Sequence, residues 1–87
     1  MDTSFDKENL KKALKQQQSE INDHTIYKAL ALFQKDENNR KIFEKISKEE
    51  KYHYDFWVKI TNKQIEAQKL VVWWYIFLVK VFGTSFA

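Results

Sequence analysis

A glutamate and a histidine with metal-ligand spacing stand in the middle of an apolar stripe. Ile46 precedes Glu50 and His53 at helical spacing, and Trp57 continues the same stripe. Residues three apart on a helix project to one face, so Glu50 and His53 place a carboxylate beside an imidazole in a buried seam. A buried carboxylate without a partner is costly. The pair therefore indicates a cation, a strong donor or a metal ion nearby, and a metal site is the most specific of these hypotheses.

Glu20 is expected to lie level with this pair if the chain folds as a helical hairpin. The polar cluster Asp36–Asn39 predicts a short turn, and two long helices joined by a short connection pack antiparallel. With the turn centred near residues 35–37, Glu20 falls within about one helical turn, roughly 5 Å along the axis, of Glu50 and His53. Two carboxylates and an imidazole, with no thiolate, suit iron or manganese and less specifically zinc.

Three neighbouring residues carry weaker signals. His24 follows Glu20 at i+4, which is a workable metal pair, although a satisfied polar residue at the bundle edge is the favoured interpretation. Glu49 becomes a ligand only if its helix is rotated, and a solvated role is favoured for it. Tyr27 lies two turns from Glu20 on the same face, where it can be a core residue with its hydroxyl on a neighbour. No nucleophile triad, phosphate loop or calcium loop is recognised, so no catalytic residue is assigned.

The composition predicts one all-α domain. A chain of 87 residues with one glycine and no proline has too few breakers for a turn-rich β fold. The absence of cysteine excludes disulfides, zinc ribbons and rubredoxin-type iron sites, and is compatible with the cytoplasm. The net charge of +3 is mild and its signs are interspersed, so no nucleic-acid partner is expected.

Three helices are expected from the apolar pattern and its interruptions, over about residues 5–35, 39–61 and 64–82. Thr3 or Ser4 is the expected N-cap of the first helix, and Asp36 or Asn38 that of the second. Gly83 is expected to end the third in the left-handed conformation. The first helix also carries a stripe of polar or small residues where a simple amphipathic helix would carry leucine. Its members are Ala13, Gln17, Glu20, His24, Tyr27 and Ala31.

The third helix is apolar on all sides over residues 70–79 and should be buried on more than one side. A two-helix hairpin cannot cover it, which predicts a second chain, a membrane surface or missing sequence. The apolar run is about 13 residues, short of the roughly 20 that span a bilayer. For Trp73, Trp74 and Tyr75, packing in a core or a dimer interface is favoured over a membrane-interface belt.

The residues Glu20 and Tyr27 and the Glu50-x-x-His53 motif resemble the first half of a rubrerythrin-like domain of the ferritin superfamily. The tail, Val81–Phe86, is similar to the segment that follows this hairpin in vacuolar-type iron transporters with an N-terminal rubrerythrin-like domain. The resemblance implies a non-haem di-iron site with Glu20, Glu50 and His53 as iron ligands. It also implies that Tyr27 lies beside the cluster and donates to a ligating carboxylate, and that ferroxidase or peroxidase chemistry takes place there.

The family's second hairpin, with its own Glu and Glu-x-x-His, has no counterpart in this sequence, and neither has the transporters' membrane domain. We therefore expect residues 1–87 to form a single ferritin-like half-domain. It is either a fragment of a longer protein, which would include a membrane domain, or a half-domain that forms a homodimer or larger homo-oligomer. Two-fold symmetry would supply four carboxylates and two imidazoles. Small encapsulated ferritins, which build their site between two chains, are a looser parallel.

The predicted function is an iron-binding ferritin-like domain with a carboxylate/histidine di-metal site, either oxidising iron or gathering it for a transporter. It would act in the cytoplasm, alone or as the soluble domain of a membrane protein. The alternative is a metal-free module whose third helix dimerises or docks on a membrane. A membrane-active amphipathic peptide is a weaker third hypothesis.

Overall fold

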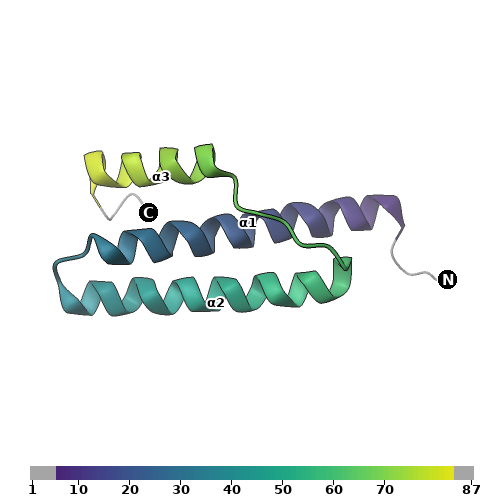
Figure 1. Ribbon diagram of the computed structural model, residues 1–87, viewed down its shortest axis with the longest axis horizontal. Helices are drawn as coiled ribbons and strands as arrows, with labels where there is room; N and C mark the ends of the chain where they lie inside the picture. The colour runs from purple at the N-terminus through teal and green to yellow at the C-terminus, as the bar shows by residue number, and fades with distance from the viewer. Residues whose placement is uncertain (1–5, 84–87) are drawn as a thin grey trace.

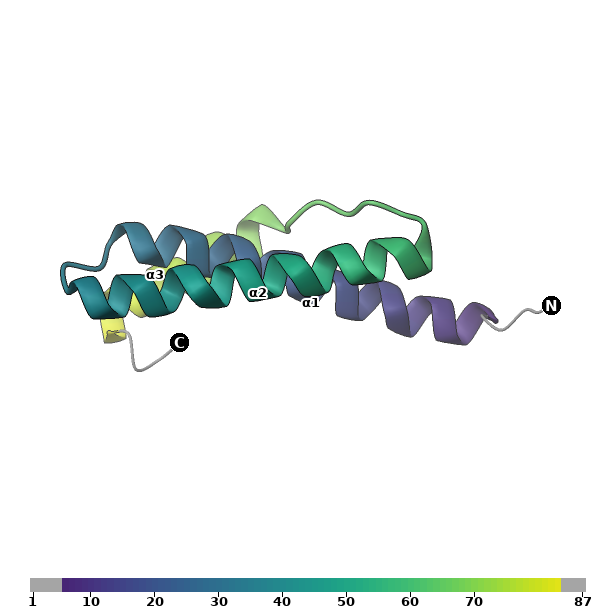
Figure 2. The ribbon, with the colours of Figure 1, turned by 90° about the horizontal axis from the view of Figure 1, so that it is seen from below.

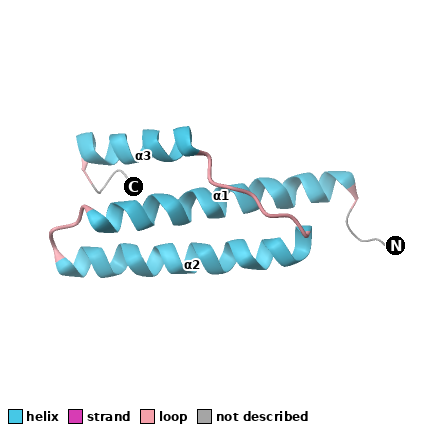
Figure 3. Cartoon of the chain, in the orientation of Figure 1, coloured by secondary structure: helices cyan, strands magenta, loops and turns pink. Residues whose placement is uncertain are grey.

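The computed structural model describes residues 6–83, which form three helices, α1 (Lys7–Leu32), α2 (Glu37–Thr61) and α3 (Lys69–Phe82). α1 and α2 form a long antiparallel hairpin, and α3 lies along α1 on the side away from α2 (Figure 1). The short loop between the first two helices and the longer segment before α3 are the connections within the described residues (Figure 3). The predicted all-α class is confirmed.

Acidic side chains cap the first two helices. Asp6 accepts a hydrogen bond of 2.8 Å from the backbone N–H three residues later, and starts α1. The other caps expected for this helix, Thr3 and Ser4, lie outside the described residues. Asp36 accepts a hydrogen bond of 3.0 Å from the backbone N–H of Asn38, so Asp36 is the N-cap of α2. The helix therefore begins earlier than it would with Asn38 as its N-cap.

The segment between α2 and α3 is extended, so the prediction that the third helix begins at Gln64 is wrong: α3 begins at Lys69. Asn62 ends α2 in the left-handed conformation, with φ 57° and ψ 32°. Gly83 follows α3 with the expected positive φ, 93°, but its ψ of 172° is not the left-handed helical value that was predicted. Figure 2 shows the extended segment running back alongside the hairpin to reach α3.

Side chains of the hairpin hold the extended segment by its backbone. The bonds run from Gln17 to the carbonyl of Lys63 (2.8 Å), from Gln18 to that of Glu66 (2.9 Å), and from the Tyr54 hydroxyl to that of Ile65 (2.8 Å). Gln17 is fully buried and also accepts a 2.6 Å bond from the Thr61 hydroxyl. These bonds satisfy backbone groups that a helix would otherwise pair internally, which explains why no helix forms here.

The polar stripe of α1 lies in the seam with α2. Gln17 meets Thr61, Glu20 meets His53, His24 meets Ser47 and the Tyr27 ring meets the Phe43 ring. Small and polar groups in this seam let carboxylates approach from both helices, which an all-leucine seam would not.

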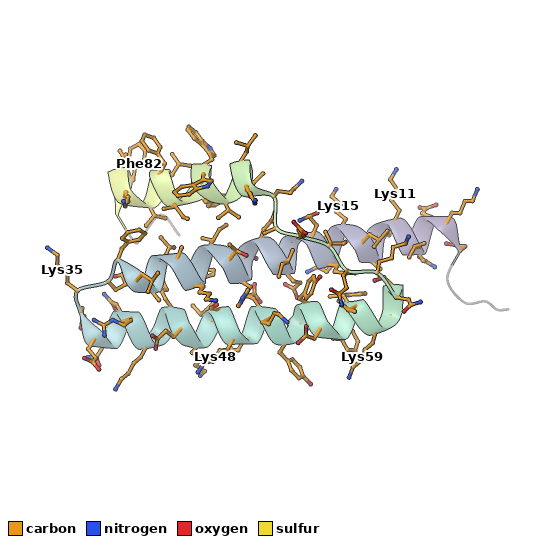
Figure 4. All side chains as sticks on the ribbon, in the orientation of Figure 1. Lys11, Lys15, Lys35, Lys48, Lys59 and Phe82 are labelled. Atoms are coloured by element: carbon orange, nitrogen blue, oxygen red, sulfur yellow. The ribbon has the colours of Figure 1, made fainter. Side chains whose placement is uncertain are left out.

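α3 contributes one face to the main apolar cluster and leaves the rest exposed. The cluster consists of Ile26, Leu30, Val72, Ile76 and Val79. Large apolar side chains on the outer face include Leu70, Trp73, Trp74, Phe77 and Phe82. Figure 4 shows side chains projecting from α3 away from α1, with Lys48 and Lys59 projecting from α2 on the opposite side of the molecule. The hairpin thus covers only part of α3, as expected. None of the helices in the described part of the chain is long and apolar enough to cross a membrane.

The apolar cluster predicts that truncating Leu30, which is fully buried, destabilises the fold strongly. Truncating Leu32, which is exposed on the same helix, should have little effect on stability. Leu30→Ala should lower the free energy of unfolding by about 2–5 kcal/mol through lost burial and a cavity. Leu32→Ala should change it by less than about 0.5 kcal/mol. Urea unfolding followed by far-UV circular dichroism measures both, and equal losses would contradict the packing of α1 against α3.

Candidate metal centre

Glu20, Glu50 and His53 converge in the middle of the hairpin. The Nδ1 atom of His53 lies 3.2 Å from Oε2 of Glu20 and 3.1 Å from Oε1 of Glu50. Each of the three residues offers a ligand atom within 4.8 Å of the others. α1 supplies Glu20, and α2 supplies Glu50 and His53 one turn apart. The turn between Leu32 and Glu37 brings them level, as the hairpin arithmetic predicted.

The three side chains differ in burial. The side chains of Glu20 and Glu50 are 10% and 18% exposed, while that of His53 is 51% exposed. The expectation that His53 lies in the buried seam is therefore wrong. α3 packs along the carboxyl-terminal half of α1 and leaves the seam near His53 uncovered. There an open groove of about 810 Å³ runs between the helices, lined by residues that include Ala13, Glu20, Tyr52, His53, Phe56 and Trp57.

One ring nitrogen of His53 faces two carboxylate oxygens at once. In the tautomer that fits, the Nδ1–H group donates toward both Glu20 and Glu50. No lysine or arginine among residues 6–83 forms an ion pair with either carboxylate. Burial raises the pKa of Glu20, His53 opposes this rise, and the charge of Asp23 adds to it. The Nδ1 proton occupies a position in which a metal ion could meet the same two oxygens.

Asp23 adjoins this group through Glu50, a neighbour that the sequence did not indicate. Its carboxyl group is hydrogen-bonded to that of Glu50, and burial followed by the proximity of Glu50 raises the pKa of Asp23 to about 6. Asp23 follows Glu20 by three residues, which puts both on neighbouring positions of one helix face. That i, i+3 spacing is the signal in the sequence that indicates Asp23, whereas the polar stripe of this helix runs through His24.

Tyr27 lies beside the carboxylates, half-buried, with its ring centroid 5.5 Å from that of Phe43. Burial raises the pKa of Tyr27 most, and the charges of Asp23 and Glu50 and the nearby Tyr75 add to this rise. A phenol that resists ionisation remains a hydrogen-bond donor, which suits the role expected for it beside acidic ligands.

The structure does not bring the two weaker candidates into the group. The Nδ1 atom of His24 lies 2.8 Å from the carbonyl oxygen of Ser47, and the Ser47 hydroxyl donates to the His24 carbonyl at 3.0 Å. His24 thereby ties α1 to α2. Glu49 is exposed and lines a shallow groove among the lysines of α2, away from Glu20.

A long antiparallel hairpin with glutamates from both helices and a Glu-x-x-His motif is the architecture of half a ferritin-like bundle. The family model for rubrerythrin matches residues 1–81, and the chain belongs to the rubrerythrin family. The searches found no significant match among curated proteins or among solved structures.

The raised pKa of Asp23 predicts a specific pH dependence for the metal-free chain. At pH values between 3.8, the ordinary pKa of an aspartate, and about 6, the folded chain holds a proton on Asp23 that the unfolded chain has lost. This contribution to the free energy of unfolding therefore falls as pH rises through that window. The melting temperature of Asp23→Asn should exceed that of the wild type near neutral pH, and the difference should vanish near pH ~4.

Thermal melts in the presence of a chelator check this, with Asp55→Asn as the control. Asp55 is an exposed aspartate on α2, paired with Lys51 at 2.7 Å, and its replacement makes the same chemical change away from the group. A difference for Asp23→Asn that is the same at both pH values would contradict the assignment.

Proposed function

We propose that the chain binds iron through Glu20, Glu50 and His53 as half of a ferritin-like di-metal site. The observation that carries this proposal is the convergence of three ligand atoms within 4.8 Å, in a chain of the rubrerythrin family. Manganese, or less specifically zinc, can take the place of iron in such a ligand set.

The residues present fit a divalent cation. The donors are hard carboxylate oxygens and one imidazole, with no thiolate. Two largely buried carboxylates face one half-exposed imidazole and no lysine or arginine pair within the described residues. An added cation would balance this acidic charge, which a neutral imidazole alone cannot do.

Each side chain of the group would have its own role at the metal site. A di-iron pair held by these residues would supply the oxidation of ferrous iron by dioxygen or peroxide, which is the ferroxidase or peroxidase chemistry that the resemblance implies. Glu20 and Glu50 would hold the ions from opposite helices, and His53 would have to give up its Nδ1 proton to bind. Tyr27 would donate to a ligating carboxylate and fix its orientation. The open groove beside His53 gives ions access from solvent.

We further propose that a second copy of the chain completes the site across the groove. Three ligands per chain leave coordination positions open, and a two-fold axis would double them to four carboxylates and two imidazoles. His53 is exposed on this side, and the aromatic side chains of Tyr52, Phe56 and Trp57 line the groove with it. Aromatic side chains are enriched in contacts between proteins, so this surface suits a contact between two identical faces.

The exposed face of α3 supports a second candidate function, a helical module that associates through α3 without metal. Trp73, Trp74 and Phe77 stand exposed together on this helix, and an exposed apolar patch marks an interaction surface.

An iron-transporter context, with this chain as the cytoplasmic iron-gathering part, stays a prediction from the resemblance of the tail.

Iron binding can be tested by anaerobic titration with ferrous iron and metal analysis after desalting. Glu50→Gln and His53→Ala should each lower the affinity by at least about tenfold, because each removes a ligand. Glu49→Gln is the matched control, since it makes the same change one position away on an exposed side chain, and it should bind like the wild type. Unchanged iron content in the two site variants would reject the proposal and favour the metal-free module.

The dimer can be tested with two phenylalanines of nearly equal exposure, Phe56 at 53% and Phe77 at 54%. Phe56→Glu places a charge in the groove and should convert an iron-loaded dimer into a monomer. Phe77→Glu, on the outer face of α3, should leave that dimer intact. Light scattering coupled to size-exclusion chromatography measures the mass. Loss of the dimer in Phe77→Glu alone would instead assign the dimer contact to α3.

A further inference from the structure

We infer that the outer face of α3 binds to the surface of a membrane that contains anionic lipid. The inference goes beyond the proposed iron site and does not depend on it, because the face lies on α3 whereas the three ligand residues lie on α1 and α2. The helix would lie in the plane of the lipid headgroups, with its aromatic side chains between the lipids and nearby lysines on the headgroups.

α3 is apolar on two opposite sides, and α1 covers only one of them. The buried side consists of Val72, Ile76 and Val79. The exposed side carries large apolar residues three or four positions apart, which places them on one face. They are Leu70, Trp73, Trp74, Phe77 and Val81. Tryptophan suits the boundary between lipid and water, because its ring is apolar while its indole N–H can still donate a hydrogen bond.

The packing of α3 determines how this face can approach a membrane. The buried side holds α3 along α1, so the helix runs beside the hairpin (Figure 1). α3 has 14 residues and is therefore about 21 Å long. It can thus present its outer face to a flat surface along its whole length, as helices that lie in the membrane interface do.

The charges around this face favour an anionic surface. α3 contains no acidic residue, and Lys69 and Lys80 lie near its two ends. Lys11 and Lys15 project from α1 to the same side of the molecule as α3 (Figure 4). Both line a groove along the first turns of α1 in which Glu8 is the one acidic residue among the described residues. Lysines beside an apolar face attract anionic headgroups to that face.

The same charges argue against a second copy of α3 as the occupant of this face. A two-fold contact would bring two helices together that both contain lysines and no acidic residue. Like charges that face each other across an interface weaken it. Each chain also has a net charge of +3, which adds to the repulsion. Anionic lipid supplies the negative charge that a second copy lacks.

Binding of the full chain to lipid vesicles can be measured by flotation. The wild type should bind vesicles of mixed phosphatidylcholine and phosphatidylglycerol at least about tenfold more tightly than vesicles of phosphatidylcholine alone, and added salt should weaken the binding. The tryptophan emission should shift to shorter wavelength on binding, because Trp73 and Trp74 leave water.

Two variants with the same change in charge test the face itself. Phe77 on α3 is 54% exposed, and Ile42 on α2 is 53% exposed. Phe77→Glu should lower the affinity for the mixed vesicles at least about tenfold, because it places a carboxylate among the lipids. Ile42→Glu should lower it at most about twofold, since α2 lies on the far side of α1 from α3. Circular dichroism checks that both variants are folded.

Two double variants test the lysines. Lys11→Gln with Lys15→Gln should lower the affinity for the mixed vesicles at least about tenfold. Lys48→Gln with Lys59→Gln removes the same charge from the opposite side of the molecule (Figure 4). The molecule is 22 Å across, and charges are screened over about 8 Å at physiological ionic strength. The second pair should therefore change the affinity by less than about threefold.

Three kinds of result would overturn the inference. Absence of binding to the mixed vesicles would reject the membrane as the partner. A loss in Phe77→Glu no greater than in Ile42→Glu, or equal losses in the two lysine pairs, would mean that overall charge rather than the outer face of α3 holds the chain. Self-association without vesicles that Phe77→Glu abolishes would assign the face to a second copy of the chain.

Discussion

The half-exposed imidazole of His53, set between two largely buried carboxylates, is the interaction around which the hairpin is arranged. Bringing Glu20 and Glu50 together costs free energy, because both lose water and repel each other. The only basic side chain among residues 6–83 that contacts them is that of His53, and histidine is a weak base. The seam therefore has to be small and polar on the α1 side. That explains why Ala13 and Gln17 lie where leucines would give a stronger core.

The apolar packing that stabilises the fold lies on a different face of α1. Ile26 and Leu30 turn a different face toward α3, where Val72 and Ile76 cover them. One helix thus packs on two neighbours with different chemistry, largely polar toward α2 and apolar toward α3. The extended segment before α3 makes this arrangement possible. The side-chain amide of Gln17 donates a hydrogen bond to the backbone carbonyl of Lys63 in this segment. This bond connects the polar seam to the segment that leads to α3.

The sequence was sufficient to predict the hairpin and the meeting of Glu20 with Glu50 and His53. Helical periodicity and one polar turn determine which residues lie level, and neither depends on long-range detail. The extension of residues 62–68 was not predictable in this way, because tertiary bonds from Gln17 and Tyr54 decide it rather than local propensity. The exposure of His53 was not predictable from the pattern either, because it depends on the groove that stays open between α1 and α2. The position of Asp23 depends on the rotation of α1, which a stripe of mixed polar residues leaves undetermined.

Two surfaces remain uncovered in one chain, and their chemistry separates them. The groove beside His53 combines ligand atoms with aromatic rings, whereas the outer face of α3 offers apolar side chains. Only a contact across the groove can add ligands to the site, because α3 packs on α1 and not on the part of the seam that contains His53. A dimer formed through the groove would leave Trp73 and Trp74 exposed. The proposed metal binding and the proposed association through α3 would therefore use two separate faces of the chain.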